Sequence, residues 1–328
     1  MNKKLMIIGF ISLLMLIMAA CGGGDKPKQS TTASGSKNAG IENSGDAATK
    51  TIEYLGKKYT IPKKAEKIVI TGAMEAMEDA VVLDVHPAGA ISVGGKFPKI
   101  FASITSDSES IGEKQQPNFE KILSLKPDVI LGSSKFQQVV LNKLEKIAPT
   151  IPISHIATNW EANLELMAEL TGKQTKAEKI LTQYKTDVKD AKASLKEKLK
   201  DKKVAIIRIR GAQAFVYPED VYFNPVLYNE LGLAVPQPIS LAKTQEAISV
   251  EQLGEMNPDY LFVQFSTDEN QEASQAFDDM KKNPVIRNMT AFKKDQVYIN
   301  VVHPLLEGGP AYSRIQFLEA LQQQLENK

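Results

Sequence analysis

Two arginines, Arg208 and Arg210, stand two positions apart near the end of a predicted strand, Val204 to Ile209. Residues two apart on a strand point to the same face, so two charges share one side of an otherwise apolar strand and need water or an anion there. Lys135 follows a second predicted strand, which ends at Leu131. Because open α/β sheets bind ligands beyond the carboxyl ends of their strands, these cations predict an anion site. A structural salt bridge is the alternative for the arginine pair.

A repeated segment indicates how the chain is organised. Asn118–Leu131 aligns without a gap with Ser249–Phe262, and both copies carry a Glu at the third position and a Pro-Asp pair near the end. Each copy predicts a short helix that begins after Asn or Ser, a turn at Pro-Asp and an apolar strand. A repeat at this separation predicts two similarly built lobes, and a cleft between lobes is a natural place for a ligand.

The loops before the two copies carry further cations. Lys114 precedes the first copy and Lys243 the second, while Gln245 occupies the position that the repeat pairs with Lys114. Five cations could thus converge on one cleft, although the whole chain has a formal net charge of only +1. This pattern favours a compact polyanion as ligand. For each lysine a solvated surface position is the alternative, and Lys96 is a weaker candidate because no strand end positions it.

The repeated glutamates, Glu120 and Glu251, each occupy the second position after the predicted helix cap. A carboxylate in the first turn is stabilised by the helix dipole, and Ser249 with Gln252 predicts a capping box. Helix stabilisation alone would therefore account for the repeat of Glu. Contact with a partner protein, one on each lobe, is the second interpretation.

Several other chemistries find no support. His86, His155 and His303 are far apart and lack acidic or histidine neighbours at metal-ligand spacing, so we expect no protein metal ligand. No glycine-rich phosphate loop, nucleophile elbow or basic stripe with interleaved aromatics occurs, which argues against an enzyme and against nucleic-acid binding. A surface-anchored α/β enzyme and an adhesion protein without a small ligand remain the competing classes.

The amino terminus predicts export. A basic start is followed by an apolar run from Leu5 to Ala20 and then by Cys21, the single cysteine of the chain. We interpret residues 1–20 as a signal peptide and Met18–Cys21 as similar to a bacterial lipobox, so that Cys21 would be lipidated. An ordinary secretory peptide is the alternative. Residues 21–50 are rich in small and polar residues and predict a flexible tether.

The remaining chain alternates predicted strands and helices, which is typical of an α/β fold. We expect an N-terminal lobe over 51–173, a long polar linking helix over 174–200 and a C-terminal lobe over 201–328. The predicted strands are Lys67 to Thr71, Gly89 to Ile91, Val129 to Leu131, Ile151 to Ser154, Val204 to Ile209, Tyr260 to Gln264 and Val297 to Asn300, with a hairpin over Thr51 to Ile61 and a last helix over Ala311 to Leu325.

With these parts in view, the chain resembles the helix-spanned (class III) substrate-binding proteins of ATP-driven iron-siderophore importers. Specifically, it looks like the Gram-positive lipoproteins that bind ferric bacillibactin and ferric enterobactin. The resemblance covers essentially the whole body of the chain, and the segments that carry it are Gly94–Pro98, Gly112–Lys114, Arg208–Arg210, Val221–Asn224 and Met256–Asp259.

The resemblance implies two Rossmann-like lobes joined by one long helix, which close on the ligand by small tilts. It implies a ferric tris-catecholate ligand, whose iron is held by the siderophore so that no cofactor is needed. It also implies a monomer, anchored by lipid on the extracellular face of the cell membrane, which docks on the permease dimer of an ABC importer through Glu120 and Glu251. The implied ligand contacts are Lys114, Lys135, Arg208, Arg210, Lys243 and Gln245. His303 falls where such relatives carry an acidic residue. A hydroxamate siderophore, haem or a corrinoid is the alternative cargo.

Overall fold

The computed structural model describes residues 49–326, apart from the side chains of residues 268, 269 and 271. The predicted signal peptide, the lipidation of Cys21 and most of the predicted tether lie outside these residues. Within them, no helix is both long and apolar enough to cross a membrane. The tether prediction runs slightly too far, because strand β1 already begins at Thr49 and pairs with β2 in an antiparallel hairpin.

The first sheet has the strand order β6-β5-β4-β3-β7-β8 and is parallel except for β6, which pairs antiparallel with β5. Its central strands β3 and β7 are buried along their whole length, as expected for a parallel sheet with helices on both faces. With the hairpin and its helices it forms what we call the N-terminal lobe. The strands are β1 (Thr49–Tyr54), β2 (Lys57–Pro62), β3 (Ile68–Thr71), β4 (Gly89–Ser92), β5 (Glu109–Glu113), β6 (Gln116–Pro117), β7 (Val129–Ser133) and β8 (Thr150–Ile153). The helices are α1 (Met74–Leu83), η1 (Lys99–Phe101), α2 (Ala102–Thr105), α3 (Phe119–Leu125), α4 (Gln138–Glu145), η2 (Ala157–Asn159) and α5 (Trp160–Thr171).

The second sheet has the order β11-β10-β9-β12-β13. Strands β9, β12 and β13 are parallel, whereas β10 and β11 form an antiparallel extension that the sequence patterns missed because both strands are short and partly exposed. This sheet and its helices form the C-terminal lobe. The strands are β9 (Val204–Arg210), β10 (Gln213–Val216), β11 (Glu246–Ile248), β12 (Tyr260–Phe265) and β13 (Val297–Ile299). The helices are η3 (Val226–Glu230), α7 (Gln237–Leu241), α8 (Val250–Met256), η4 (Asp268–Ala273), α9 (Ala276–Lys282), α10 (Pro284–Asn288), α11 (Thr290–Lys293) and α12 (Ala311–Glu326).

The repeated segments fold alike, as predicted. Helix α3 begins after Asn118, whose side chain accepts a hydrogen bond from the backbone N–H of Lys121. Helix α8 begins after Ser249, which forms the predicted capping box with Gln252. Both helices end in a left-handed residue before the Pro-Asp turn, and strands β7 and β12 follow. The helix, turn and strand predicted for each copy are therefore confirmed.

The repeated aspartates have a structural role that the spacing did not indicate. Asp128 Oδ2 accepts a hydrogen bond from the backbone N–H of Lys67 at 2.8 Å, just before β3. Asp259 Oδ2 accepts one from Lys203 at 3.0 Å, just before β9. Each aspartate thus joins the start of one strand to the start of its parallel neighbour, so the pair sets the same register in both lobes.

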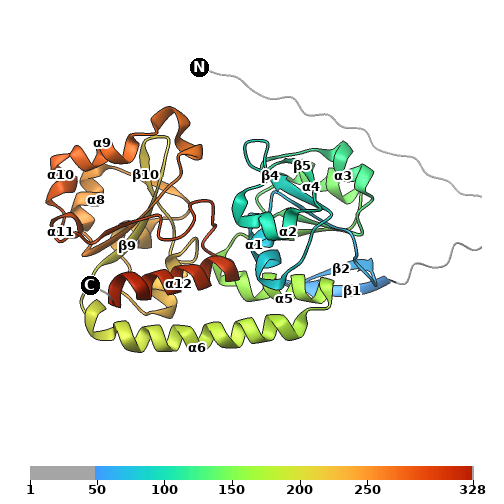
Figure 1. The fold of residues 1–328 in the computed structure, drawn as a ribbon, viewed down its shortest axis with the longest axis horizontal. Helices are drawn as coiled ribbons and strands as arrows, with labels where there is room; N and C mark the ends of the chain where they lie inside the picture. The colour runs from blue at the N-terminus through green and yellow to red at the C-terminus, as the bar shows by residue number, and fades with distance from the viewer. Residues whose placement is uncertain (1–48, 327–328) are drawn as a thin grey trace, which may run out of the picture. The chain divides into compact units, whose positions relative to one another are not determined.

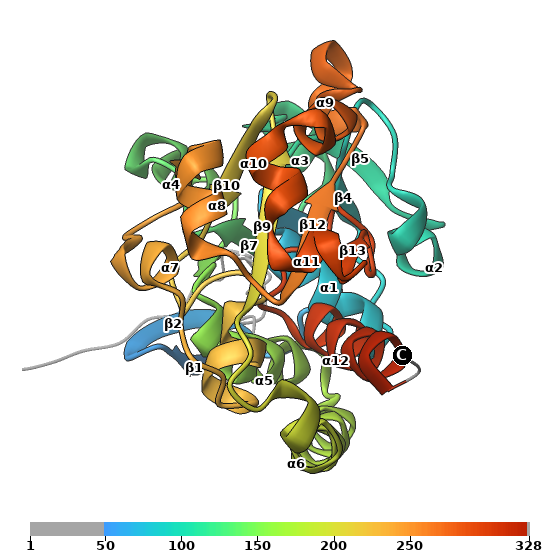
Figure 2. The same cartoon turned by 90° about the vertical axis from the view of Figure 1, so that its left-hand side faces the viewer.

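Helix α6 (Gln174–Leu199) follows the first sheet and precedes the second in the chain, and it runs beneath both lobes in Figures 1 and 2. It packs against α5 of the N-terminal lobe and against α12. Helix α12, drawn in red, also packs against α1 of the N-terminal lobe. The end of the chain therefore returns to the first lobe, so the lobes share a packed base in addition to α6.

A buried arginine holds this base together. Arg314 of α12 is 1% exposed and donates hydrogen bonds to the carbonyl oxygens of Gly309 and Ala157, each at 2.6 Å. Its guanidinium also pairs with Glu230 of η3, which accepts a hydrogen bond from Tyr184 of α6 at 2.5 Å. One side chain thereby connects elements of both lobes with the long helix.

Candidate functional site

A cavity of about 580 Å³ lies between the lobes, and residues of both lobes line it. Its position agrees with the rule for open α/β sheets, because Lys135 follows the end of β7 and Arg210 ends β9. All six residues predicted to contact a ligand line this cavity, namely Lys114, Lys135, Arg208, Arg210, Lys243 and Gln245. The structure therefore brings together side chains that are far apart in the sequence, while their role in binding stays a prediction.

Strand β9 presents the two arginines as its alternation predicts. Arg208 is only 3% exposed; its guanidinium lies 5.8 Å from the ring centre of Tyr222 and donates to the carbonyl oxygen of Pro304 at 3.3 Å. Arg210 donates to Gln245 Oε1 at 2.9 Å, which joins β9 to the residue just before β11. Arg208 is thus packed beside the Tyr222 ring and Arg210 is tied to Gln245, and both guanidinium groups line the cavity.

The two lysines from the N-terminal lobe meet carboxylates. Lys114 forms an ion pair with Glu307, and Lys135 Nζ lies 3.3 Å from Glu75 and 3.7 Å from Glu307. Burial lowers the pKa of Lys135, but Glu75 and Glu307 outweigh it, so the net shift of this pKa is upward. Both lysines are partly exposed and carry their charges at the cavity wall.

Sequence reasoning missed the acidic and aromatic part of the site. Glu307, Asp220, Tyr217, Tyr222 and His155 also line the cavity. The two tyrosine rings stack with their centres 4.6 Å apart and form an aromatic wall. Tyr222 has a positive φ of 64°, which is rare for a bulky residue and common at functional sites. Tyr222 belongs to the segment Val221–Asn224 that carries the family resemblance, but the sequence patterns gave that segment no role at the site, and no local pattern indicated Glu307.

Two further candidates lie elsewhere. Lys96 is exposed in a turn that is closed by a bridge to Val93, and it is not among the residues lining the cavity. His303 is exposed, accepts a hydrogen bond from the backbone N–H of Leu305 at 3.2 Å and does not line the cavity either. The structure thus gives neither residue a place at the cavity wall.

The repeated glutamates face solvent. Glu120 lies in the first turn of α3 and Glu251 in the first turn of α8, and both are exposed. Helices α3 and α8 lie in different lobes (Figure 1). Each lobe therefore carries one exposed glutamate in the equivalent first turn of a helix. The arrangement agrees with a helix-dipole role and with docking, and docking stays a prediction.

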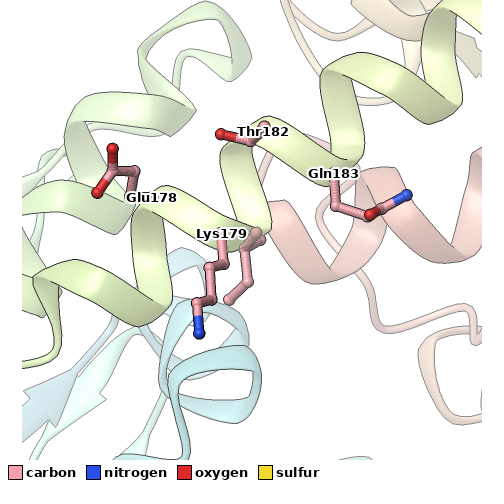
Figure 3. Close-up of a pocket in the computed structure, with 5 residues that line it drawn as sticks. Glu178, Lys179, Thr182 and Gln183 are labelled. Atoms are coloured by element: carbon pink, nitrogen blue, oxygen red, sulfur yellow. The ribbon is translucent and has the colours of Figure 1, made fainter.

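A hollow of similar volume occurs on the long helix α6 (Figure 3). Its lining consists of Glu178, Lys179, Ile180, Thr182 and Gln183, all from that one helix. The side of a single helix cannot surround a ligand, and a ligand site needs convergent groups from several elements. We therefore place the functional site in the cavity between the lobes.

Comparison with known proteins supports this choice. A family model described as periplasmic binding protein matches residues 86–300. The iron-uptake system-binding protein of Bacillus subtilis is 48% identical over 323 residues, which cover 98% of this chain and 99% of that protein. The iron(3+)-hydroxamate-binding protein FhuD of the same organism is 29% identical over 272 residues and covers 80% of both chains.

A solved structure agrees in fold as well. It is the triscatecholate siderophore binding protein FeuA from Bacillus subtilis in complex with ferri-bacillibactin. FeuA superposes with a TM-score of 0.82 at 50% sequence identity, and the match covers 85% of this chain and 99% of that one. The mixed α/β fold predicted for the chain is thereby confirmed.

Proposed function

Because this chain belongs to the periplasmic binding protein family, we propose that it captures a ferric catecholate siderophore of the bacillibactin or enterobactin type and delivers it to an ABC importer for iron uptake. Members of this family bind substrates for transport, so the chain is an extracytoplasmic substrate-binding protein and not an enzyme. The bound cargo is proposed to lie in the cavity between the lobes.

The observation that carries this proposal is the charge of the cavity wall. Among the described residues, five cations and two carboxylates, Asp220 and Glu307, line the cavity, and their formal charges sum to three positive charges. An Fe³⁺ ion bound by six catecholate oxygens leaves three negative charges on the complex. Charge of opposite sign and equal size favours both the rate of encounter and the choice of ligand. A neutral hydroxamate complex would leave the cations uncompensated.

Each group has a suitable role toward such a ligand. The arginine guanidinium groups donate hydrogen bonds to catecholate oxygens and stack on aromatic rings, and the lysines supply point charges. The stacked pair of Tyr217 and Tyr222 would give the catechol rings an aromatic stretch of cavity wall to pack against. We propose that iron enters only inside its siderophore; among the side chains that the structure describes, which exclude Asp268 and Glu269, His, Asp and Glu form no cluster that could hold a metal ion.

Delivery is proposed to depend on two contacts, one of Cys21 with the membrane and one of Glu120 and Glu251 with the permease. A lipid on Cys21 would keep the protein at the extracellular face of the membrane. We propose that the protein acts there as a monomer. The exposed Glu120 and Glu251 would each meet one half of the permease dimer. Two equivalent carboxylates on two similar lobes match a partner built from two similar halves.

A titration with two iron complexes tests the cargo. We expect ferric bacillibactin to bind at least about a hundredfold more tightly than neutral ferrichrome, since its charge meets several cations. Calorimetry and quenching of Trp160, the single tryptophan, give two independent readouts. Equal affinity for the two complexes, or a preference for ferrichrome, would refute the catecholate assignment and favour the hydroxamate alternative suggested by the FhuD relative.

A further inference from the structure

The cavity contains an anion of its own. Glu307 lies in the segment between β13 and α12, and its carboxylate pairs with Lys114 and lies 3.7 Å from Lys135. Both lysines belong to the N-terminal lobe, whereas Glu307 follows the last strand of the C-terminal lobe. The carboxylate therefore occupies the place where an anionic cargo would meet these two lysines.

The backbone around Glu307 is held firmly. Its N–H donates to Glu78 Oε1 of α1 at 2.7 Å, and Glu78 also accepts from the backbone N–H of Ser313 at 3.2 Å. The next residue, Gly308, has a φ of +80°, and a Cβ there would lie 2.6 Å from the backbone of Tyr222. These contacts fix the loop to α1 and to the backbone at Tyr222, and the Glu307 side chain faces the lysines.

The charge of Glu307 is also secure. Burial alone would raise the pKa of this carboxyl, but Lys114, Lys135 and Arg208 outweigh burial and hold the pKa well below its usual range. The side chain is 13% exposed, so water screens these interactions only weakly. Glu307 therefore stays ionised throughout the neutral range and supplies a permanent negative charge among the cations.

We propose that Glu307 is an internal counterion that competes with the cargo for Lys114 and Lys135. Cargo entry must break these ion pairs, which lowers affinity, and when cargo leaves the carboxylate pairs with the lysines again, which speeds release. Without cargo, Lys114 and Lys135 thereby keep a compensating negative charge beside them. The inference rests on the proposed function, because it takes the competing ligand to be a ferric catecholate.

The test replaces the carboxylate and leaves the loop intact. In E307Q the backbone N–H still donates to Glu78, and the side chain keeps its size but loses its charge. With ferric bacillibactin as probe, we expect E307Q to bind at least about tenfold more tightly, mainly through slower dissociation in stopped flow. In a Lys114→Met background the same change should give a clearly smaller gain, because one of the competing pairs is already absent.

Asp220→Asn is the matched control. Asp220 lines the same cavity, but among the described ion pairs none joins it to either lysine. We expect D220N to strengthen binding less than E307Q. Equal gains in the two variants would mean that only net charge matters, and weaker or unchanged binding by E307Q would also overturn the competition. Absence of binding by the unaltered protein would instead refute the proposed function, and the role of Glu307 with it.

Discussion

Replacing Arg314 by methionine should destabilise the packed base between the lobes strongly. Methionine fills much of the same space but removes the charge and all donors. The change would leave the carbonyl oxygens of Gly309 and Ala157 and the carboxylate of Glu230 without their arginine partner. The perturbation therefore tests whether one buried side chain links the two lobes to α6.

The magnitude follows from burial. Removing one partner of a buried ion pair costs about 3–5 kcal/mol, because the other charge is left uncompensated. Arg314 is 1% exposed and Glu230 is 21% exposed, and Tyr184 continues to donate to Glu230. Because water partly reaches Glu230, we expect the lower end of the range of about 3–5 kcal/mol, a loss of about 3 kcal/mol in the free energy of unfolding. This is a large part of the roughly 5–15 kcal/mol typical of folded domains.

Urea unfolding followed by circular dichroism measures the loss. Fluorescence of Trp160 is a second probe, because the Arg314 guanidinium lies 4.9 Å from its ring centre in the unaltered protein. Arg287→Met is the matched control, since Arg287 is exposed at the end of α10 and its replacement should change the free energy by less than about 0.5 kcal/mol. The slope against urea concentration should stay the same if only stability changes.

A double variant makes the reasoning refutable. If the pair is the cause, Glu230→Gln together with Arg314→Met should cost less than the sum of the single changes by about 1–3 kcal/mol, because neither charge is then left alone. A loss below about 1 kcal/mol for Arg314→Met, or strictly additive changes, would show that the buried pair does not hold the base together.

Three further outcomes are expected. Arg210→Ala should weaken the binding of ferric bacillibactin, measured by calorimetry, about tenfold to a hundredfold, because hydrogen bonds to charged groups contribute about 1.5–3 kcal/mol. Lys96 lies outside the cavity, so the control variant Lys96→Ala should leave the affinity unchanged. Charge reversal of Glu120 or Glu251 to Arg should leave the same titration unaltered but reduce cellular uptake of iron from the siderophore; weaker binding in these variants would contradict a docking role. Burial raises the pKa of Asp79 well above its usual range, so the folded state binds more protons than the unfolded state and stability should increase as pH falls from 7 toward about 4. Melting temperatures measured between pH 7 and about 4 follow this rise in stability, and Asp79→Asn should make the rise smaller. An equal dependence of melting temperature on pH in the variant would contradict the role of Asp79.

Much of the fold was predictable because its signals are local. The apolar runs that became β3, β7, β9 and β12 are typical of buried parallel strands, and both repeat copies carry their own helix caps. The short strands β10 and β11 were missed, since they have too few residues to show a period and gain their stability from pairing with β9. The position of the site was predictable because ligands of open α/β sheets bind beyond the carboxyl ends of the strands. That rule needs only the direction of each strand and not the packing of its side chains.

The acidic residues show where local rules end. Glu75, Glu78 and Asp79 lie on α1 and are all buried, although carboxylates on a short helix are usually solvated. Glu75 pairs with Lys135, and Glu78 accepts hydrogen bonds from the backbone N–H groups of Glu307 and Ser313, all far away in the chain. No window of sequence contains both sides of such a contact.

The sequence by itself determined the types of charge and their placement at strand ends, and thus a cationic site for an anion. Only the tertiary structure decided that a carboxylate shares this site, because Lys114 and Glu307 are 193 positions apart and meet only when the loop before α12 passes between the lobes. Local patterns report which groups a chain carries and on which side of an element they lie. The pairing of Glu307 with the cavity lysines arises from tertiary packing, because the interaction of two charges depends on their distance in space and not on their separation in the sequence.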